Sequence, residues 1–472
     1  MATSTETVTL SCRDGQISTG DTSWVLISSI LVLAMMPALA FFEAGMLRSK
    51  NTLAILTQVL IGLSLLSVLW AVVGFSLVFG TDHGGFIGGF QHVLLIKTPY
   101  FDCLPGQTIP AACYALFQSM FAAITPLLMT GAVAERMKLQ ALLIFIVLWE
   151  IVVYYPVAHW VWGGGWLGAM GVLDFAGGIV IHTTAGAGSL VAAVVLGPRK
   201  HFLEYHGEFP PSNLPLAAVG AGLLWMGWFG FNGGSALAAG AVAVSAVLST
   251  QLAASVSTVV WVLLSALHGG KPSATTVFNG ALAGLAGITP ASGYLSSPST
   301  LVVGLILGIA SFYGVRLIKL RLHIDDALDV SSIHGIPGAI GALAIGFASE
   351  KAVNPDGADG LFFGNPRLLA VQLLAVVVAA AWATFWTYVL LKIISRCMGN
   401  ELRVSSHAEH VGLDWAEHGE VAYHNLAVLD DTTMRASIIE RMDMPTSAAY
   451  RRFGDAVSTP CSMVIQNQEP LL

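Results

Sequence analysis

Long apolar stretches, separated by short polar segments, fill most of the chain between residues 24 and 397. A helix that crosses a bilayer needs about 20 consecutive, mostly apolar residues. The strands of a membrane β-barrel would instead alternate polar and apolar side chains over about ten residues, and no segment of this sequence does so. The pattern predicts an all-α integral membrane protein with eleven transmembrane helices, near residues 24–47, 53–80, 114–134, 139–158, 174–197, 214–235, 243–267, 274–293, 299–320, 330–350 and 367–397.

The composition agrees with a chain whose main solvent is lipid. Of 472 residues, 55% are hydrophobic and 10% are charged, against about 25% charged in an average soluble domain. The 50 glycines fit this interpretation, because small residues let membrane helices approach closely. Residues 1–23 are polar with Arg13 as their single basic residue, so we expect an extracellular N-terminal segment and no removable signal peptide.

Lysine and arginine predict the orientation, because they favour cytoplasmic loops. If the N-terminus lies outside, the outer segments carry four basic residues and the inner loops and helix ends carry twelve. We therefore expect an extracellular segment 1–23, a transmembrane domain 24–397 and a cytoplasmic tail 398–472. The twelve inner basic residues are Arg48, Lys50, Arg136, Lys138, Arg199, Lys200, Lys271, Arg316, Lys319, Arg321, Lys392 and Arg396.

The polar residues contain an internal repeat. Asp174 precedes His182 by eight residues in the fifth span, and Asp326 precedes His334 by eight residues in the tenth. Because each unit would hold five spans, an odd number, the second unit must enter the membrane inverted. Inverted repeats place the functional site near the midplane, where the halves meet. The spacing predicts two inverted five-helix repeats followed by a long final helix.

Five ionisable side chains lie inside the predicted spans: Glu43, Glu150, Asp174, His182 and His334. Such groups are costly in lipid and indicate functional sites by default. One buried histidine is more often structural, but two at matching repeat positions can hydrogen-bond to each other, which would fix both tautomers. Burial favours the neutral pair. A neutral pair inside an apolar tube suits a small, neutral, hydrogen-bonding molecule.

Aromatic residues gather at the predicted outer ends of three spans. Residues 159–166 and 228–235 are rich in Trp, Phe and Gly, while Phe117 and Phe121 are four residues apart and so share a helix face. An interfacial aromatic belt is the ordinary explanation. The functional alternative is a cation–π cage, worth roughly 0.5–2 kcal/mol, which would recruit a small cation without offsetting its full dehydration.

The cysteines do not indicate a metal site. Five cysteines are too few and too scattered for a metal framework, and we expect neither a metal nor another cofactor. Cys12, Cys103 and Cys113 lie on the predicted outer side, where a disulfide is chemically feasible. One of these three would remain unpaired.

Four segments together resemble the ammonium transporter family, the Amt/Mep proteins that are related to the Rh proteins. They are residues 158–165, 173–178, 228–235 and 325–335, and the resemblance extends from about residue 22 to Tyr423. It implies eleven spans with the N-terminus outside, a pore in each subunit of a homotrimer, and location in the plasma membrane. It also implies ammonium or methylammonium as the substrate.

The resemblance assigns an outer recruitment site for ammonium to Phe117, Trp162 and Ser235. Asp174 would be the buried carboxylate behind this site. Its position at a helix start suits capping of backbone N–H groups, and its charge would also favour a nearby cation. The sequence does not separate these two roles.

The same resemblance assigns a stacked gate to Phe121 and Phe231, and the paired histidines of the pore to His182 and His334. A vestibule that binds a cation, followed by a gate and a dry pore, would favour loss of a proton before passage. The sequence leaves open whether the net species is NH₃, NH₄⁺, or NH₃ with a separately moved proton.

Two acidic residues depart from the family pattern. Glu43 occupies a position where members often carry Tyr or a small residue. Glu150 lies in the middle of the fourth span, where an apolar or small residue would be expected. The ordinary explanation for Glu150 is a protonated or paired carboxyl at a helix or subunit contact, and the alternative is an additional proton route.

The polar tail resembles the C-terminal signature of the family, which packs against the inner face and adjusts activity. Its acidic residues face a core whose inner loops are basic, so we expect a docked tail that a cytosolic kinase or regulatory protein could displace. The residues that carry this resemblance are Gly412, Asp414, Glu417, His418, Gly419 and Tyr423.

Other classes of function fit the sequence less well. An intramembrane enzyme would need a His-Glu-x-x-His, Gly-x-Ser-x-Gly or phosphate-loop motif, and none is present. Nothing indicates a nucleic-acid partner. Two alternatives stay open: an ammonium transporter that also acts as a nutrient sensor, and an Rh-like neutral gas channel.

Overall fold

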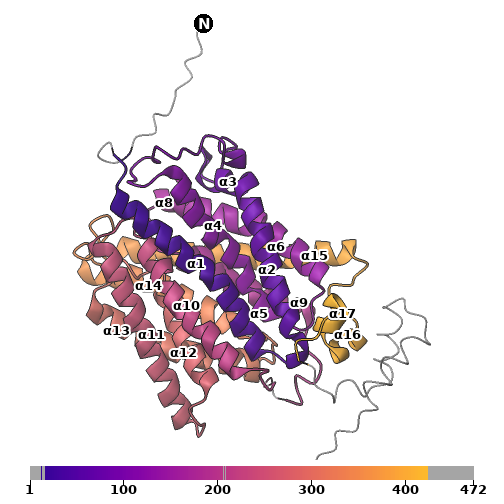
Figure 1. Ribbon diagram of the computed structural model, residues 1–472. Coiled ribbons are helices and arrows are strands. Elements are labelled where there is room, and N and C mark those ends of the chain that lie inside the picture. Colours follow the sequence, from indigo (N-terminus) through magenta and orange to yellow (C-terminus); the bar gives the residue numbers. More distant parts are fainter. Residues whose placement is uncertain (1–11, 13–15, 206, 208, 424–472) are drawn as a thin grey trace, which may run out of the picture. The chain divides into compact units, whose positions relative to one another are not determined.

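The computed structural model describes residue 12, residues 16–205, residue 207 and residues 209–423. Contacts divide the chain into two units, Met1–Ala422 and Tyr423–Leu472, and only the first residue of the second unit is among those described. The first unit is a bundle of long helices (Figure 1). Apart from a two-residue hairpin, the described secondary structure is helical, which confirms the predicted all-α class.

The first half of the bundle contains five helical spans, several of which are interrupted by wide π-helical turns. In chain order the elements are α1 (Thr19–Met46), η2 (Ser49–Asn51), α2 (Thr52–Leu69), η3 (Trp70–Gly74), α3 (Phe75–Phe79), β1 (Asp82–His83), β2 (Ile87–Gly88), η4 (Val93–Leu95), α4 (Ala111–Leu128), α5 (Thr130–Val133), α6 (Leu139–Trp149), η5 (Glu150–Tyr154), α7 (Tyr155–Trp162), α8 (Trp166–Ala169), η6 (Gly178–Thr183) and α9 (Thr184–Leu196). The strands β1 and β2 are antiparallel, with Asp82 opposite Gly88.

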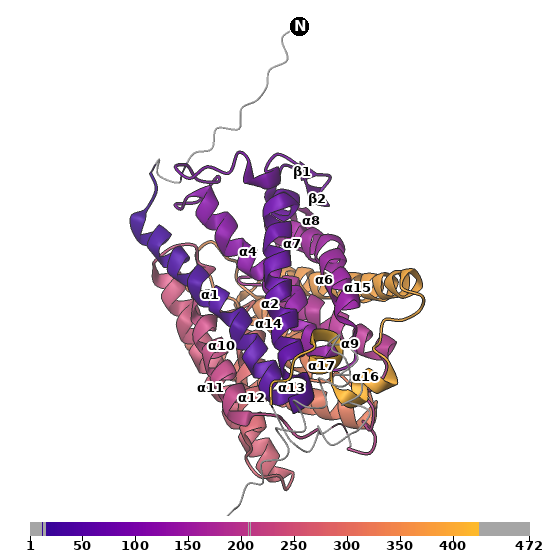
Figure 2. The same ribbon diagram turned by 45° about the vertical axis from the view of Figure 1, so that its right-hand side comes forward.

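The second half follows the same plan and ends in the longest helix and two short ones. Its elements are α10 (Leu214–Gly234), α11 (Ala241–Leu267), α12 (Ala274–Ile288), α13 (Ser297–Val315), η7 (Arg316–Arg321), η8 (Ser331–Gly335), α14 (Ile336–Ala348), η9 (Leu361–Phe363), α15 (Pro366–Cys397), α16 (Ser406–Val411) and α17 (Leu413–His418). Figure 2 shows α15 running nearly across the direction of α1.

Within the described residues, ten helices are long and apolar enough to cross a membrane. The predicted span at 274–293 contains α12, which is only 15 residues long and so is shorter than the length that a span usually needs. The count of eleven therefore stays a prediction. The predicted boundaries were otherwise close, although α1 begins at Thr19 because Ser18 accepts a hydrogen bond from the Asp21 N–H and caps the helix there.

Burial within the bundle differs sharply between helices. Among the 18 most apolar consecutive residues of each span, 89% are buried in the span that contains α4 and 33% are buried in α15. The helix α4 therefore lies at the centre of the fold, and α15 leaves most of its surface for lipid or another subunit. Close helix contacts depend on small residues: a Cβ placed on Gly220 of α10 would lie 2.4 Å from the backbone nitrogen of Phe42 in α1.

A disulfide joins Cys12 to Cys103, and Cys113 is a free, buried thiol. The bridge connects the segment before α1 to the loop before α4. Asp21 strengthens the same junction, because its carboxylate accepts hydrogen bonds from the Thr108 hydroxyl and the Ala239 N–H. The start of α1 is thus tied both to the loop before α4 and to the segment between α10 and α11.

Candidate functional site

A cavity of about 690 Å³ opens at one end of the bundle, which we call the Trp162 end. Its wall contains Phe121, Trp162, Asp174 and Ser235. The Trp162 indole N–H donates a 2.8 Å hydrogen bond to the main-chain oxygen of Asp174, which fixes the plane of the ring. The Ser235 hydroxyl donates to the main-chain oxygen of Phe231, so its oxygen lone pairs remain available to a donor in the cavity.

Phe117 does not line this cavity. Its side chain is fully buried, and its ring lies 4.8 Å from that of Phe121, centroid to centroid. Tyr114 and Gln118 line the wall instead. Tyr114, Gln118 and Phe121 are spaced i, i+4, i+7 and so share one face of α4. This spacing could have been read from the sequence, but the sequence interpretation relied on the aromatic pair Phe117 and Phe121 instead.

Two phenylalanines close the floor of the cavity. The rings of Phe121 and Phe231 lie 4.4 Å apart between centroids, at an angle of 46°, and both side chains are 1% exposed. Trp162 meets Phe121 edge-on at 6.4 Å. Passage beyond the Trp162 cavity therefore requires these rings to move.

The Asp174 carboxylate caps the broken fifth span. One oxygen accepts hydrogen bonds from the N–H groups of Gly177 and Gly178 at 2.9 and 2.7 Å, and the other accepts from Ile179 and Val180 at 2.8 and 3.0 Å. Gly177 has a φ of 110°, in the left-handed region that favours glycine. The four N–H groups at the start of η6 would otherwise lack acceptors, so the capping role follows directly from the geometry.

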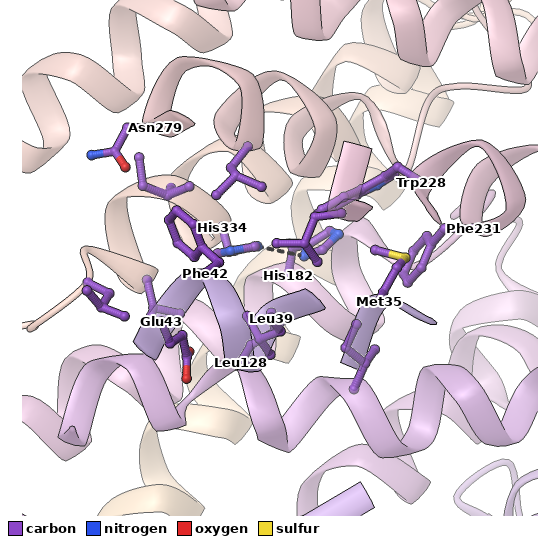
Figure 3. A pocket seen from close by; sticks show the side chains of 16 residues that line it. Met35, Leu39, Phe42, Glu43, Leu128, His182, Trp228, Phe231, Asn279 and His334 are labelled. Carbon is purple, nitrogen blue, oxygen red and sulfur yellow. Dashed lines mark hydrogen bonds between the residues drawn. The ribbon is translucent and has the colours of Figure 1, made fainter. Parts of the chain in front are cut away.

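Behind the phenylalanines lies a chamber of about 30 Å³ (Figure 3). Most of its wall is aliphatic or aromatic, and its ionisable groups are His182, His334 and Glu43. The Nδ1 atoms of the two histidines are 3.3 Å apart, so one nitrogen donates a proton and the other accepts it. A doubly protonated pair could not make this contact.

Trp228 stacks on both histidines, with ring centroids 5.6 Å from His182 and 6.4 Å from His334. Its indole N–H donates to the Thr289 hydroxyl, which holds the ring against the chamber. The sequence interpretation had placed Trp228 in a possible interfacial belt and missed this position. Trp228 precedes Phe231 by three residues, so the two share a helix face, and both line the chamber. This spacing could have predicted the position of Trp228.

The two histidines meet because their helices cross at glycines. A Cβ on Gly186 would lie 2.5 Å from the backbone nitrogen of Gly335. A Cβ on Gly338 would lie 3.2 Å from the backbone nitrogen of Thr183. Each glycine follows its histidine by four residues and touches the residue next to the other histidine, as a twofold relation between the repeats requires.

A third cavity, of about 390 Å³, lies at the opposite end of the bundle, which we call the Arg199 end. It shares Phe42, Asn279 and Leu328 with the chamber. The three cavities thus form a row, interrupted by the Phe121–Phe231 pair on one side of the histidines and narrowed at Phe42 on the other. Figure 3 shows this order, with Phe231 at one end, the histidine pair in the middle and Asn279 at the other end.

The Arg199 end is organised by buried ion pairs. Arg199 binds Asp325 and Glu135 at 2.8 Å each, and Arg48 binds Glu135 at 2.9 Å. Burial alone would raise the pKa of Glu135, but the charges of Arg199 and Arg48 outweigh it and hold that pKa at about 2. These arginines were expected to attract the tail, yet their carboxylate partners belong to the transmembrane core.

The tail docks through basic residues of the inner loops and through helix starts. Lys138 pairs with Glu401, and the Lys50 and Lys200 side chains donate to main-chain oxygens of the tail. Asp414 accepts a hydrogen bond from the Ala54 N–H at the start of α2, and Glu417 accepts one from the Leu139 N–H at the start of α6. Carboxylates are favoured at helix N-termini, where N–H groups lack partners. Gly412 has a φ of 115° and packs against the Lys50 backbone.

The other residues of the predicted tail signature are His418, Gly419 and Tyr423. Gly419 ends α17 in the left-handed conformation, and His418 is the last residue of that helix. Tyr423 is the first residue of the second unit. The hydroxyl residues Ser437, Thr446 and Ser447, which follow this signature and on which the predicted kinase could act, lie outside the described residues.

Glu150 is fully buried where η5 begins, in the span that leads to Trp162. Its carboxyl group lies beside the hydroxyl of Tyr155, with which it interacts. Glu150 lines none of the three cavities. The structure therefore separates it from the row that contains the histidines.

The sequence matches the profile of the Ammonium Transporter Family over residues 23–423. The chain belongs to this family. It is 59% identical over 426 residues to ammonium transporter 1 of Dictyostelium discoideum, covering 90% of this chain and 91% of that protein. It is 43% identical to ammonium transporter Amt1 of Archaeoglobus fulgidus over 407 residues, covering 86% of this chain and all of that protein.

Solved structures of ammonium transporter family proteins share the fold. The crystal structure of Mep2 from Candida albicans matches with a TM-score of 0.79 and 33% identity, covering 89% of this chain and 92% of that one. A structure described as a sensor Amt protein matches with a TM-score of 0.77 and 29% identity, covering 84% and 98% of the two chains. This ammonium transporter family member is accordingly a multi-pass membrane protein.

Proposed function

We propose that this ammonium transporter recruits NH₄⁺ at the Trp162 cavity, removes its proton, and conducts NH₃ through the histidine chamber. The observation that carries the proposal is the size and lining of the chamber. A volume of about 30 Å³ accommodates about two water-sized molecules, since one occupies roughly 10–15 Å³ by this measure. A hydrated cation does not fit.

Energetics favour proton loss before passage. A bare ion in an apolar medium loses hydration free energy on the order of tens of kcal/mol, while a cation–π contact returns only about 0.5–2 kcal/mol. The histidine pair supplies one donor and one acceptor along the chamber, which suits neutral ammonia. The aromatic cavity thus concentrates the cation, and the chamber selects the neutral molecule.

The three residues of the recruitment site and the carboxylate behind it take unequal parts in this proposal. Trp162 and Ser235 face the cavity and would contact ammonium directly. Phe117 would act through Phe121, against which it packs. Asp174 holds η6 and the Trp162 ring in place, and its negative charge adds to the attraction of the cavity for a cation.

We further propose that the Trp162 end faces the outside of the plasma membrane and that the chain forms a homotrimer. The distribution of basic residues supports this orientation, and the largely exposed face of α15 leaves room for subunit contacts. In this arrangement residues 1–23 are extracellular, residues 24–397 form the transmembrane domain and residues 398–472 lie in the cytoplasm.

A growth experiment tests the function in cells. Cells that lack their own ammonium uptake should grow on low ammonium when they express this protein, and should take up methylammonium. Correctly inserted protein that gives neither result would refute the assignment. An Rh-like gas channel is less favoured, because Trp162 and Ser235 both line the entrance cavity, where they can contact a cation.

A combined transporter and sensor is the second candidate, supported by the docked tail and by the resemblance to the sensor Amt protein. The tail would regulate transport and serve as the target of a cytosolic kinase or regulatory protein. Truncation after residue 430 should change flux modestly, whereas truncation after residue 405 removes the contacts of Asp414 and Glu417 and should change it strongly. Equal transport by both truncated forms and the full chain would show a passive tail.

A further inference from the structure

Glu43 is the one acidic side chain on the wall of the histidine chamber, among the residues that the structure describes. It belongs to a face of α1 on which Met35, Leu39, Phe42 and Glu43 follow one another at helical spacing and all line the chamber. The side chain is 2% exposed. Figure 3 shows Glu43 beyond the histidine pair, on the side away from Phe231.

The carboxyl group lies beside other residues of the chamber wall. A Cβ on Gly131 would be 2.8 Å from Glu43 Oε1 and 3.1 Å from Val330 Cγ2. The same Cβ on Gly131 would be 3.3 Å from Leu328 Cβ. Both Val330 and Leu328 line the chamber. Glu43 therefore lines the chamber and also joins α1 to α5 through Thr130 and Gly131.

The hydrogen-bond pattern assigns a proton to this carboxyl group. The Thr130 hydroxyl lies 2.8 Å from Glu43 Oε2 and 2.6 Å from the main-chain oxygen of Leu127. A hydroxyl has only one hydrogen to donate. The Thr130 hydroxyl donates it to the Leu127 carbonyl oxygen, because that contact is the shorter one and a carbonyl oxygen can only accept. The contact to Glu43 is then satisfied when Glu43 donates, while the Gly131 N–H donates to the carboxyl group.

We propose that Glu43 is a proton-transfer residue that reprotonates ammonia as it leaves the histidine chamber toward the Arg199 end. This inference rests on the proposed function and adds the group that returns the proton. The Glu43 O–H bond breaks as the ammonia lone pair forms an N–H bond, giving ammonium and a carboxylate. The Thr130 hydroxyl can rotate to donate to that carboxylate.

The cycle closes with the proton that ammonium released at the Trp162 cavity. The histidine pair accepts this proton, and the resulting imidazolium returns it to the Glu43 carboxylate across the small chamber. One ammonium enters and one leaves, so atoms and charge balance. Transport is then electrogenic even though the species that crosses the chamber is neutral ammonia.

The test uses purified full-length protein in liposomes, with current and internal alkalinisation recorded after addition of ammonium chloride. Glu43→Gln preserves the shape, because its amide can donate to Thr130 and accept from Gly131. We expect its current to fall at least tenfold, while internal alkalinisation rises above that of wild type, because ammonia then enters without the proton that Glu43 returns. Glu43→Asp retains an acid and should keep a current at least threefold above that of Glu43→Gln.

Glu150→Gln is the matched control, because Glu150 is also a buried carboxyl group but lines no described cavity. It should retain both signals within twofold. A Glu43→Gln current within twofold of wild type would overturn the proposal. So would joint loss of current and NH₃ entry in protein that elutes as wild type does, or wild-type uptake without current. Absence of any uptake by the wild type would instead refute the proposed function.

Discussion

The two halves of the repeat use the same residues at the same spacing but support them differently. Asp174 accepts four backbone hydrogen bonds at the start of η6. Asp326 accepts only from the N–H and hydroxyl of Ser331, and its Oδ1 atom has no partner among the described residues. Both aspartates nevertheless precede a wide turn that carries a chamber histidine.

This difference shows which feature the repeat preserves. Each half presents its histidine from a wide turn, η6 or η8, and wide turns of this kind often occur at functional sites. The first half is rigidly capped and also anchors Trp162, whereas the second lies beside the charged groups of the Arg199 end. We infer that the cap of the first half fixes Trp162 at the entrance as well as His182, whereas the cap of the second half mainly positions His334.

The largest expected effect is the loss of transport in Asp174→Ala. Four buried N–H groups would lose their acceptor, at about 1–3 kcal/mol each, so η6 should not hold its shape. Ammonium uptake in liposomes should fall at least tenfold, and uptake by Asp326→Ala should fall less. Normal uptake by well-folded Asp174→Ala would remove the contrast between the halves.

Next in size is a change of selectivity when either histidine becomes aspartate. His182→Asp or His334→Asp places a charge in the chamber, which lowers the cost of admitting a cation. We expect K⁺ to compete with ammonium in uptake assays of both variants and not in assays of the wild type. If both variants keep wild-type selectivity, the role of the paired imidazoles is incorrect.

A moderate effect is expected at the entrance, to which the first half contributes Trp162 and the second half Ser235. Trp162→Leu removes a cation–π contact, so the ammonium concentration for half-maximal uptake should rise about 2- to 30-fold. Trp166→Leu is the control, because Trp166 stacks on Trp160 at 5.8 Å and does not line the cavity. An equal shift in both variants would indicate a general effect of tryptophan loss.

The smallest effect should come from Ser331→Ala. This change removes the hydroxyl bond to Asp326 but leaves the Ser331 N–H bond, and a single hydrogen bond to a charged group contributes about 1.5–3 kcal/mol. Uptake should stay within threefold of wild type, with a slightly lower melting temperature. A loss as large as that of Asp174→Ala would show that the second half is equally dependent on its cap.

The hydrophobic pattern was sufficient to predict the fold class, because a lipid-facing chain must place about 20 apolar residues in each helix. It did not predict the wide turns, since one extra residue per turn leaves the average hydrophobicity of a span unchanged. The eighth stretch was predicted as a full span, but α12 stops at Ile288 and the chain continues in turns.

Pairs of site residues were easier to predict than the orientation of single side chains. The matching spacing of Asp174–His182 and Asp326–His334 indicated that the histidines meet. The direction in which Phe117 and Trp228 point depends on how α4 and α10 are rotated in the bundle, and neighbouring faces of both helices are apolar. Glu43 could be recognised as unusual, but only the packing of α1 places it on the chamber wall.

The account depends most on transport of ammonium through the histidine chamber. The most direct test is ammonium uptake by liposomes that contain the purified protein, with current recorded in the same preparation. We predict saturable uptake in the wild type, at least tenfold less in Asp174→Ala, and competition by K⁺ only when a chamber histidine is replaced by aspartate. Uptake that is absent, or that is unchanged in all of these variants, would contradict the account.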